Sequence, residues 1–207
     1  MFPRSVSPSR VAWLFVAIGT LSGCATPSSR DGNSAPSVAT SAARHSPRAA
    51  FTMGGRFSAQ GENERERASG QFRYTETREQ RTLSLFTPFG SAVAEVIANA
   101  TGVTLTDAQG AQRHAATVSD LLRDLFALPL PDAVLSAWLQ GLPASGDEAR
   151  DIEFDGNGWP RRFVQAGWLV DIGERRVSDG VPQRMRWSLV ASATVEIRWL
   201  IDDWSAP

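Results

Sequence analysis

ASGQFRYT, residues 68–75, alternates small or apolar side chains with polar ones. Successive side chains of an extended chain point to opposite faces, so a period of two predicts an antiparallel strand with one buried face. Similar stretches lie on both sides of it, at 55–59, 82–86, 92–98 and 103–106. The charged run at 62–67 and the Asp-Ala-Gln-Gly segment at 107–110 interrupt this pattern, and both are predicted to be turns.

A helical period replaces the strand period after residue 118. Apolar side chains recur at the spacing of one helix face in Leu121, Leu122, Leu125 and Phe126. Ser119 is predicted to be the N-cap of this helix, and the Leu-Pro-Leu-Pro segment at 128–131 ends it. A second helix is predicted from Asp132 to Gln140, with Gly141 as its C-terminal cap.

Strand patterns return in the last third of the chain, at 152–154, 161–165, 168–172, 184–190 and 194–201. The Asp-Gly-Asn-Gly sequence at 155–158 is a strong hairpin signal. Strands, then two or three helices, then strands predict one α+β domain. We expect a curved antiparallel sheet with the helices on its concave side, because this arrangement buries the apolar faces of both layers.

The N-terminus has the features of a bacterial lipoprotein signal. Arg4 and Arg10 precede an uncharged apolar run at 11–21, which is too short for the about 20 residues of a membrane-spanning helix. The run ends in Leu-Ser-Gly before Cys24, which resembles a lipobox, and Cys24 is the only cysteine of the chain. The alternative is a short buried helix with a buried cysteine. We predict a signal peptide at 1–23 and a lipid on Cys24.

The segment that follows the cysteine, 24–50, is rich in Ser, Ala, Pro and Thr and poor in large apolar residues. Such a composition cannot bury enough surface to fold, so it predicts a flexible tether in which His45 is solvated. The folded domain is expected to occupy residues 51–207. The protein is therefore expected to be anchored by lipid to a membrane and to face the periplasm.

Charge and motif content exclude several classes of function. Without the two Arg of the signal, 19 basic and 22 acidic residues remain, a net charge of −3 that argues against nucleic-acid binding. The chain has no lysine, so it has no phosphate-binding loop, and it has no Gly-x-Ser-x-Gly elbow. A lone domain histidine, His114, excludes a histidine metal cluster. We predict no enzyme activity, no cofactor and no metal.

Two weaker catalytic arrangements have simpler explanations. His114, Ser119 and Asp120 could form a triad, but Ser119-Asp120 fits a helix start better. Asp202-Asp203 could be paired acids, but adjacent residues of a strand point to opposite faces, so a solvated chain end is the preferred interpretation.

Bulky apolar residues exceed what a thin layer of sheet and helix requires. Six tryptophans lie beyond the signal, at 138, 159, 168, 187, 199 and 204. An ordinary core is one interpretation of them, and a pocket for an apolar ligand is the other.

The segment Thr-Pro-Phe-Gly-Ser at 87–91 lies between two strand patterns, where loops are usually polar. Pro88 and Gly90 predict a turn with Phe89 at its tip. Phe89 either folds back into the core or touches a membrane. Burying one Phe contributes about 2–3 kcal/mol, enough for reversible contact only.

Taken together, these segments resemble the outer-membrane lipoprotein receptor family LolB. The resemblance rests on Gly55-Arg56-Phe57, on LSLFTPFGS at 83–91, on Leu121-Leu122 leading to Leu130-Pro131, on Leu135-x-x-Trp138-Leu139-x-Gly141-x-Pro143, on Trp168-Leu169-Val170, and on Ile201-x-x-Trp204. It covers nearly the whole chain after the predicted signal.

The resemblance implies an incomplete, strongly curved antiparallel barrel covered by about three helices that enclose an apolar cavity. It implies an outer-membrane protein facing the periplasm that takes triacylated lipoproteins from the carrier LolA and inserts them among outer-membrane phospholipids, acting as a monomer. It places the membrane-insertion loop at Pro88, Phe89 and Gly90, with Phe where the family usually has Leu. The expected acyl-chain cavity is lined by Leu83, Leu85, Leu121, Leu125, Leu135, Trp138, Leu139, Trp168, Trp187 and Trp199.

Energetics favour a direct handover of such cargo. A triacylated protein carries on the order of 40 methylenes, and exposing each to water costs about 0.8 kcal/mol, so release into water would cost tens of kcal/mol. With no nucleotide site, direction would come from relative affinity. The alternative function is a non-catalytic structural or assembly accessory of the cell envelope, which would use strand edges or Trp-rich surface for protein contacts. A hydrolase built on His114 is the third hypothesis.

Overall fold

The computed structural model describes residues 45–63, 66–126 and 130–206, without the side chains of residues 122 and 124–126. By contacts the chain divides into two units, Met1–Ala35 and Pro36–Pro207, and all described residues belong to the second. The predicted signal peptide and Cys24 lie outside the described residues, as does the side chain of Leu125.

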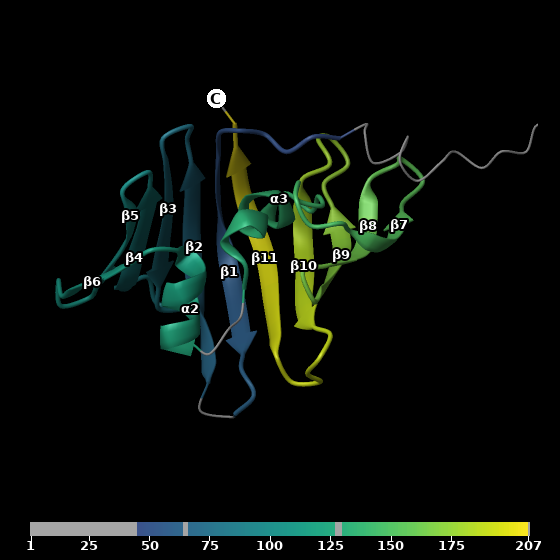
Figure 1. Cartoon of the computed structure of the whole chain (residues 1–207). Helices are drawn as coiled ribbons and strands as arrows, with labels where there is room; N and C mark the ends of the chain where they lie inside the picture. Colours follow the sequence, from purple (N-terminus) through teal and green to yellow (C-terminus); the bar gives the residue numbers. More distant parts are fainter. Residues whose placement is uncertain (1–44, 64–65, 127–129, 207) are drawn as a thin grey trace, which may run out of the picture. The chain divides into compact units, whose positions relative to one another are not determined.

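One antiparallel sheet of eleven strands makes up most of the described domain (Figure 1). The first half contributes β1 (Phe51–Gln60), β2 (Arg67–Glu76), β3 (Gln80–Phe86), β4 (Ala92–Asn99), β5 (Gly102–Asp107) and β6 (Gln112–Ala115). The second half contributes β7 (Arg150–Phe154), β8 (Pro160–Gln165), β9 (Trp168–Arg175), β10 (Pro182–Leu189) and β11 (Glu196–Ser205). The meanders predicted from the period of two are confirmed, and only the short edge strand β6 was not predicted.

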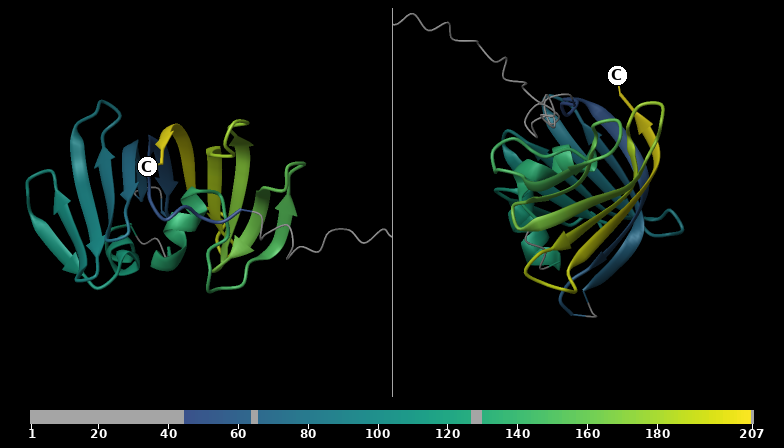
Figure 2. Two further views of the ribbon diagram at one scale, coloured as in Figure 1. Left: turned by 90° about the horizontal axis from the view of Figure 1, so that it is seen from above. Right: turned by 90° about the vertical axis from the view of Figure 1, so that its right-hand side faces the viewer.

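The strand order is β6-β5-β4-β3-β2-β1-β11-β10-β9-β8-β7, so the last strand pairs with the first. This pairing runs from Thr52 opposite Ser205 to Gln60 opposite Glu196 and joins the two meanders into one sheet. The sheet is open, because β6 and β7 are its edges. It curves, and the helices lie on its concave side (Figure 2, left).

A β-bulge interrupts the central pairing of β1 and β11. Gly54 pairs with Asp203 and Gly55 with Ile201, which leaves Asp202 as the extra residue. A Cβ atom on Gly55 would collide with the Leu200 carbonyl oxygen, so this close approach requires glycine. Bulges bend a strand and increase its twist, and this one lies in the middle of the curved sheet.

The helical layer is smaller than predicted. The described residues form two short α-helices, α2 (Val118–Phe126) and α3 (Leu135–Leu139). A single 3-10 turn, η1 (Asp132–Val134), directly precedes α3. The expectation of about three helices is therefore wrong. Pro131 precedes the 3-10 turn, and Gly141, at φ 67°, closes α3 after five residues.

The predicted cap of α2 is also wrong. Thr117, not Ser119, caps this helix: the Thr117 hydroxyl accepts a hydrogen bond from the Asp120 backbone N–H at 3.1 Å and donates one to the Asp120 carboxylate at 2.7 Å. This reciprocal pair resembles a capping box, except that the carboxylate accepts from the Thr117 hydroxyl and not from a backbone N–H. Ser119 lies inside the helix, and its hydroxyl donates to the Leu130 carbonyl at 2.7 Å.

The segment before β1 packs on the domain sooner than predicted. His45 is half-buried and not solvated, because its ring stacks on Trp159 with 3.4 Å between the ring centroids. The Arg48 backbone N–H donates to Gln140 Oε1 at 2.7 Å, and Gln140 Nε2 donates to the Arg48 carbonyl at 3.1 Å. Backbone contacts to α3 therefore fix the chain before the predicted domain boundary at residue 51.

A half-buried guanidinium holds α3 to the second meander. Arg175 donates to the carbonyl oxygens of Gly180, Gly141 and Pro160 at 2.7, 2.6 and 2.8 Å. Its Cζ atom lies 5.0 Å from the Trp159 ring centroid. Burial lowers the pKa of Arg175 to about 10, because the surrounding protein solvates its charge less well than water. Three backbone segments therefore depend on one planar donor group.

We expect Arg175→Lys to lower the free energy of unfolding by about 1–3 kcal/mol, because one ammonium group cannot reproduce a planar fork of donors. Urea unfolding followed by circular dichroism measures this loss. The neighbouring Arg176→Lys, at a partly exposed ion pair with Asp179, is the matched control and should change stability by less than about 0.5 kcal/mol. Equal effects of the two changes would contradict the assignment.

Candidate functional site

The concave face carries a cluster of large aromatic side chains. Trp138 from α3, Trp168 from β9 and Trp187 from β10 have no exposed surface. The Trp187 ring centroid lies 5.5 Å from that of Trp138 and 5.1 Å from that of Trp199 on β11. Segments distant in sequence therefore meet in one apolar layer between the sheet and α3.

The structure brings most of the predicted cavity residues together on this layer. One buried cluster contains Leu135, Trp138, Leu139, Trp168, Trp187 and Trp199, and Leu83 and Leu85 pack against it. Leu121 belongs instead to a second cluster, formed by α2, β4 and β5. Leu83 of β3 contacts both clusters, so it marks the boundary between them.

The apolar residues along this boundary are only half-buried. We call Phe57, Ala59, Leu83 and Leu85, all partly exposed and packed on the larger cluster, the apolar trough. Phe57 connects it to the aromatic layer, with 6.1 Å between its ring centroid and that of Trp199. The trough is the part of the inner face that the short helices leave incompletely covered.

Among the residues that the structure describes, two polar contacts connect the α2 side of the helical layer or β3 with the segment that leads into α3. Arg81 of β3 forms an ion pair with Asp132 of η1 at 3.0 Å, and the Ser119 hydroxyl reaches Leu130. The α3 side is tied more firmly, because Gln165 of β8 is buried beneath it with 1% of its surface exposed. Sequence analysis missed Gln165, since a Gln in a strand pattern reads as a solvent-facing position.

Gln165 is a hub of four hydrogen bonds. Its Oε1 accepts from Trp138 Nε1 at 2.8 Å and from the Ala144 backbone N–H at 2.9 Å. Its Nε2 donates to the carbonyl oxygens of Ala144 and Asp147 at 2.8 and 2.6 Å. All donors and acceptors of the amide are thereby used, which fixes α3 and the segment after it against β8.

The hairpin between β3 and β4 places Phe89 in solvent. Phe89 is 98% exposed, so it does not fold back into the core. The Gly90 N–H donates to the Thr87 carbonyl at 2.9 Å, and the Thr87 N–H donates to the Ser91 carbonyl at 2.8 Å. Gln71 Nε2 of β2 donates to the Pro88 carbonyl at 2.9 Å and braces the turn. Val93 on β4 is also exposed, so the tip has a second apolar side chain near it.

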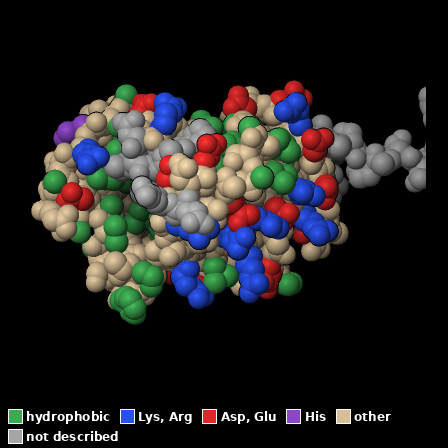
Figure 3. All heavy atoms as spheres, turned by 90° about the horizontal axis from the view of Figure 1, so that it is seen from below, with side chains coloured by type: hydrophobic (Ala, Val, Ile, Leu, Met, Phe, Trp, Pro, Cys, Tyr) green, Lys and Arg blue, Asp and Glu red, His purple; other side chains and the backbone are tan. Residues whose placement is uncertain are grey.

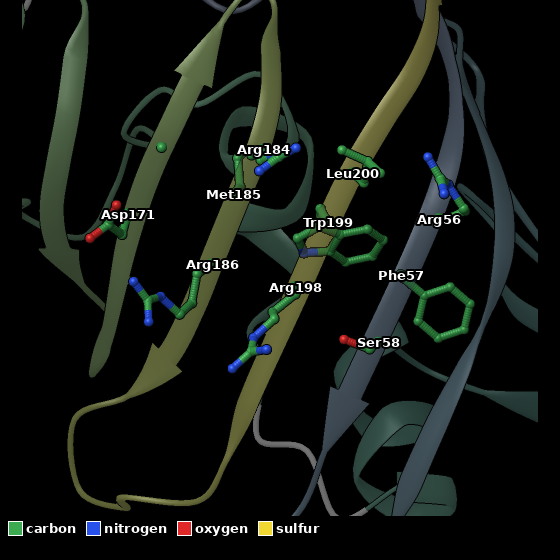
Figure 4. A pocket seen from close by; sticks show the side chains of 11 residues that line it. Arg56, Phe57, Ser58, Asp171, Arg184, Met185, Arg186, Arg198, Trp199 and Leu200 are labelled. Atoms are coloured by element: carbon green, nitrogen blue, oxygen red, sulfur yellow. The ribbon is translucent and has the colours of Figure 1, made fainter.

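The outer face of the sheet is charged. A surface groove of about 450 Å³ is lined by four arginines of β1, β10 and β11, namely Arg56, Arg184, Arg186 and Arg198 (Figure 4). Phe57, Met185 and Trp199 also line this groove. Seen from below, basic side chains gather along one side of the domain, with hydrophobic side chains beside them (Figure 3). Glu196 pairs with both Arg186 and Arg198, at 3.9 and 2.5 Å. These exposed pairs contribute little to stability.

Of the two weaker catalytic arrangements, the triad does not assemble. The His114 ring lies on β6, 3.0 Å from the Thr104 hydroxyl, whereas Ser119 bonds to Leu130 and Asp120 to Thr117. Asp202 and Asp203 both line one outer pocket, because the bulge turns both side chains to the same face. The expectation that they point to opposite faces is wrong for that reason. Asp202 forms an ion pair with Arg56 at 3.2 Å.

Among the described helices none is long and apolar enough to cross a bilayer.

An open antiparallel sheet with a helix-covered aromatic face, an apolar trough and a hydrophobic hairpin tip defines a class of half-barrel proteins. The profile of the family "Outer membrane lipoprotein LolB" matches residues 49–204. The chain belongs to this family of outer-membrane lipoproteins, which confirms the resemblance seen in its sequence.

Individual relatives agree with this assignment. Outer-membrane lipoprotein LolB of Halorhodospira halophila is 32% identical over 96% of each chain. The protein of the same name from Azoarcus sp. is 30% identical over 91% of each chain. The one from Thiobacillus denitrificans is 35% identical over 76% of this chain and 82% of its own.

Proposed function

We propose that this protein accepts triacylated lipoproteins from the periplasmic carrier LolA and inserts them into the outer membrane. Its own lipid on Cys24 would anchor it there, facing the periplasm, with residues 24–44 as the tether. The observation that supports this most strongly is a fully exposed Phe89 on a hydrogen-bonded turn. Such exposure of a large apolar side chain is unfavourable in water and is useful where it meets a membrane or an apolar partner.

The inner face is the proposed acyl-chain site. The aromatic cluster is closely packed, so acyl chains would enter along the apolar trough and part the α2 cluster from the α3 cluster. The separation of the two buried clusters supports this route. The α3 side would stay in place, since Gln165 and Arg175 bond it to the sheet. Of the predicted lining, Leu121 would move with α2.

The hairpin tip is the proposed membrane contact. Phe89 would insert among outer-membrane phospholipids while Pro88 and Gly90 hold the turn. One buried Phe contributes about 2–3 kcal/mol, so contact would be reversible and the protein could return to the carrier. The mechanism is non-catalytic and uses no cofactor, since transfer along a gradient of apolar affinity requires neither. A monomer suffices for it.

A transfer assay tests this function. The mature chain, residues 24–207 with Cys24→Ala to prevent lipidation, is mixed with LolA loaded with a labelled lipoprotein. We expect the label to move to the chain and then, when vesicles are added, to the vesicles. Folded chain that takes no cargo from the carrier would favour the alternative, an accessory lipoprotein of the envelope that makes protein contacts only.

A further inference from the structure

Two buried indole N–H groups have no acceptor. Trp187 is completely buried and Trp199 is 8% exposed, and within the described residues neither Nε1 atom has a hydrogen-bond partner. Trp204 shares this property but is only half-buried. Trp138, in the same aromatic layer, is satisfied by Gln165 at 2.8 Å. A buried donor without an acceptor destabilises a folded protein, so two in contact require an explanation.

The described residues around the two indoles offer no hydrogen-bond acceptor for either N–H group. The Trp199 ring contacts Phe72 edge-on at 4.9 Å, lies 6.1 Å from Phe57, and lies 5.1 Å from Trp187. The strands β10 and β11 pair with each other and with β9 and β1, which uses their backbone carbonyl oxygens in the sheet. Among the described residues no acceptor is left for these donors, and a bound molecule can supply one.

The position of the donors restricts what that molecule is. They lie on the inner face, and Phe57 connects Trp199 to the apolar trough. The ligand must therefore carry long apolar segments together with an uncharged acceptor. An indole offers one neutral donor and no charge, which suits a carbonyl oxygen. A phosphate would instead favour charged donors such as arginine.

We propose that Trp187 and Trp199 donate hydrogen bonds to the ester carbonyl oxygens of bound fatty acyl glycerol, and so distinguish acyl esters from plain hydrocarbon. This deepens the proposed function and rests on it. The acyl chains occupy the space opened along the trough, and the carbonyl groups lie at its aromatic end. The cost of burying two unsatisfied donors is then relieved by the correct ligand alone, which adds chemical selectivity to apolar affinity.

The test compares an ester with its ether. The probes are a fluorescent dipalmitoylglyceryl-cysteine peptide and its dihexadecyl ether analogue, delivered from cyclodextrin to the mature chain with Cys24→Ala. The ether keeps the chains and loses the carbonyl groups. We expect the ester to bind more tightly by about two- to tenfold for each N–H that engages a carbonyl. A ¹³C label on the ester carbonyls should show a lowered infrared stretching frequency on binding.

Variants separate the N–H group from the bulk of the ring. Replacing Trp187 or Trp199 by benzothienylalanine keeps ring size and puts sulfur in place of the N–H, so folding is preserved. Each replacement should reduce the ester preference and leave ether binding unchanged. The same replacement at Trp159 is the control, because this ring packs against His45 and Arg175 and does not belong to the aromatic layer. It should leave the ester preference as it is. Trp187→Phe and Trp199→Phe repeat the test with natural residues.

The outcomes are distinct. Binding of neither probe overturns the proposed function and this inference with it. Equal binding of ester and ether overturns only this inference. Displacement of the peptide by dipalmitoyl phospholipid at equal concentration would support the inference and show that membrane esters are recognised as well as cargo esters. Failure of the phospholipid to compete would support it and restrict recognition to cargo.

Discussion

Phe89→Glu should leave the uptake of lipoprotein intact and abolish its delivery to membranes. Phe89 is 98% exposed, so the change removes no packing from the folded domain. It removes an apolar side chain whose burial in a bilayer contributes about 2–3 kcal/mol, which corresponds to roughly a thirtyfold loss or more. The carboxylate adds a cost of its own in the apolar layer. Delivery is measured as labelled lipoprotein that floats with vesicles, and uptake as label bound to the chain.

Val177→Glu provides the matched control for this change. Val177 is 100% exposed on the turn between β9 and β10, so this variant makes the same type of substitution at another exposed apolar site. The Val177→Glu variant should deliver lipoprotein as the unaltered protein does. Phe89→Leu, which keeps an apolar tip, should also retain delivery. Undiminished delivery by Phe89→Glu would refute a membrane role for the hairpin, whereas lost uptake would place Phe89 at the carrier contact instead.

Gln165→Leu should destabilise the domain by about 3–5 kcal/mol, because it leaves several buried polar groups without partners at about 1–3 kcal/mol each. The groups concerned are Trp138 Nε1, the Ala144 N–H and carbonyl, and the Asp147 carbonyl. The apolar gain of Leu does not offset these losses, because the groups left without partners are buried. Urea unfolding followed by far-ultraviolet circular dichroism measures the difference.

Gln112→Leu makes the same substitution at an exposed position of the edge strand β6. Its effect on the free energy of unfolding should stay within about 0.5 kcal/mol. A Gln165→Leu variant that is as stable as Gln112→Leu would show that α3 does not depend on the Gln165 hub. In the proposed site α3 stays in place and α2 moves. That result would also remove the support for assigning the movement to α2 alone.

Much of the local structure could be predicted from the sequence. The strand at 68–75 lies within β2, and the Asp-Gly-Asn-Gly hairpin joins β7 to β8. The sequence also predicted which residue lies at the tip of the loop, because the backbone preferences of Pro88 and Gly90 specify a turn. These features depend on residues within a few positions of each other, and period and turn chemistry report such relations directly.

Helix details were less accessible, since competing caps differ by a few tenths to about 1 kcal/mol and packing decides between them. Ser119 was an equally good cap by composition, but its hydroxyl is taken by Leu130 from across the helical layer, and Thr117 performs the role. The second helix broke into η1 and a five-residue α3 for a related reason. The layer has only to cover one aromatic cluster, so tertiary packing needs little helix there.

By itself, the sequence determined the alternation of strands, the turns between them, the position of a lone cysteine behind an apolar run, and a phenylalanine at a hairpin tip. The tertiary structure alone decided that β11 closes on β1, that a bulge turns Asp202 and Asp203 to one face, that Gln165 is buried, and that Phe89 remains in solvent. The physical reason is the separation along the chain of the residues that interact. A side-chain period encodes which face of one strand is apolar, whereas backbone hydrogen bonds between distant strands carry no sequence signature and are chosen only when the whole sheet forms.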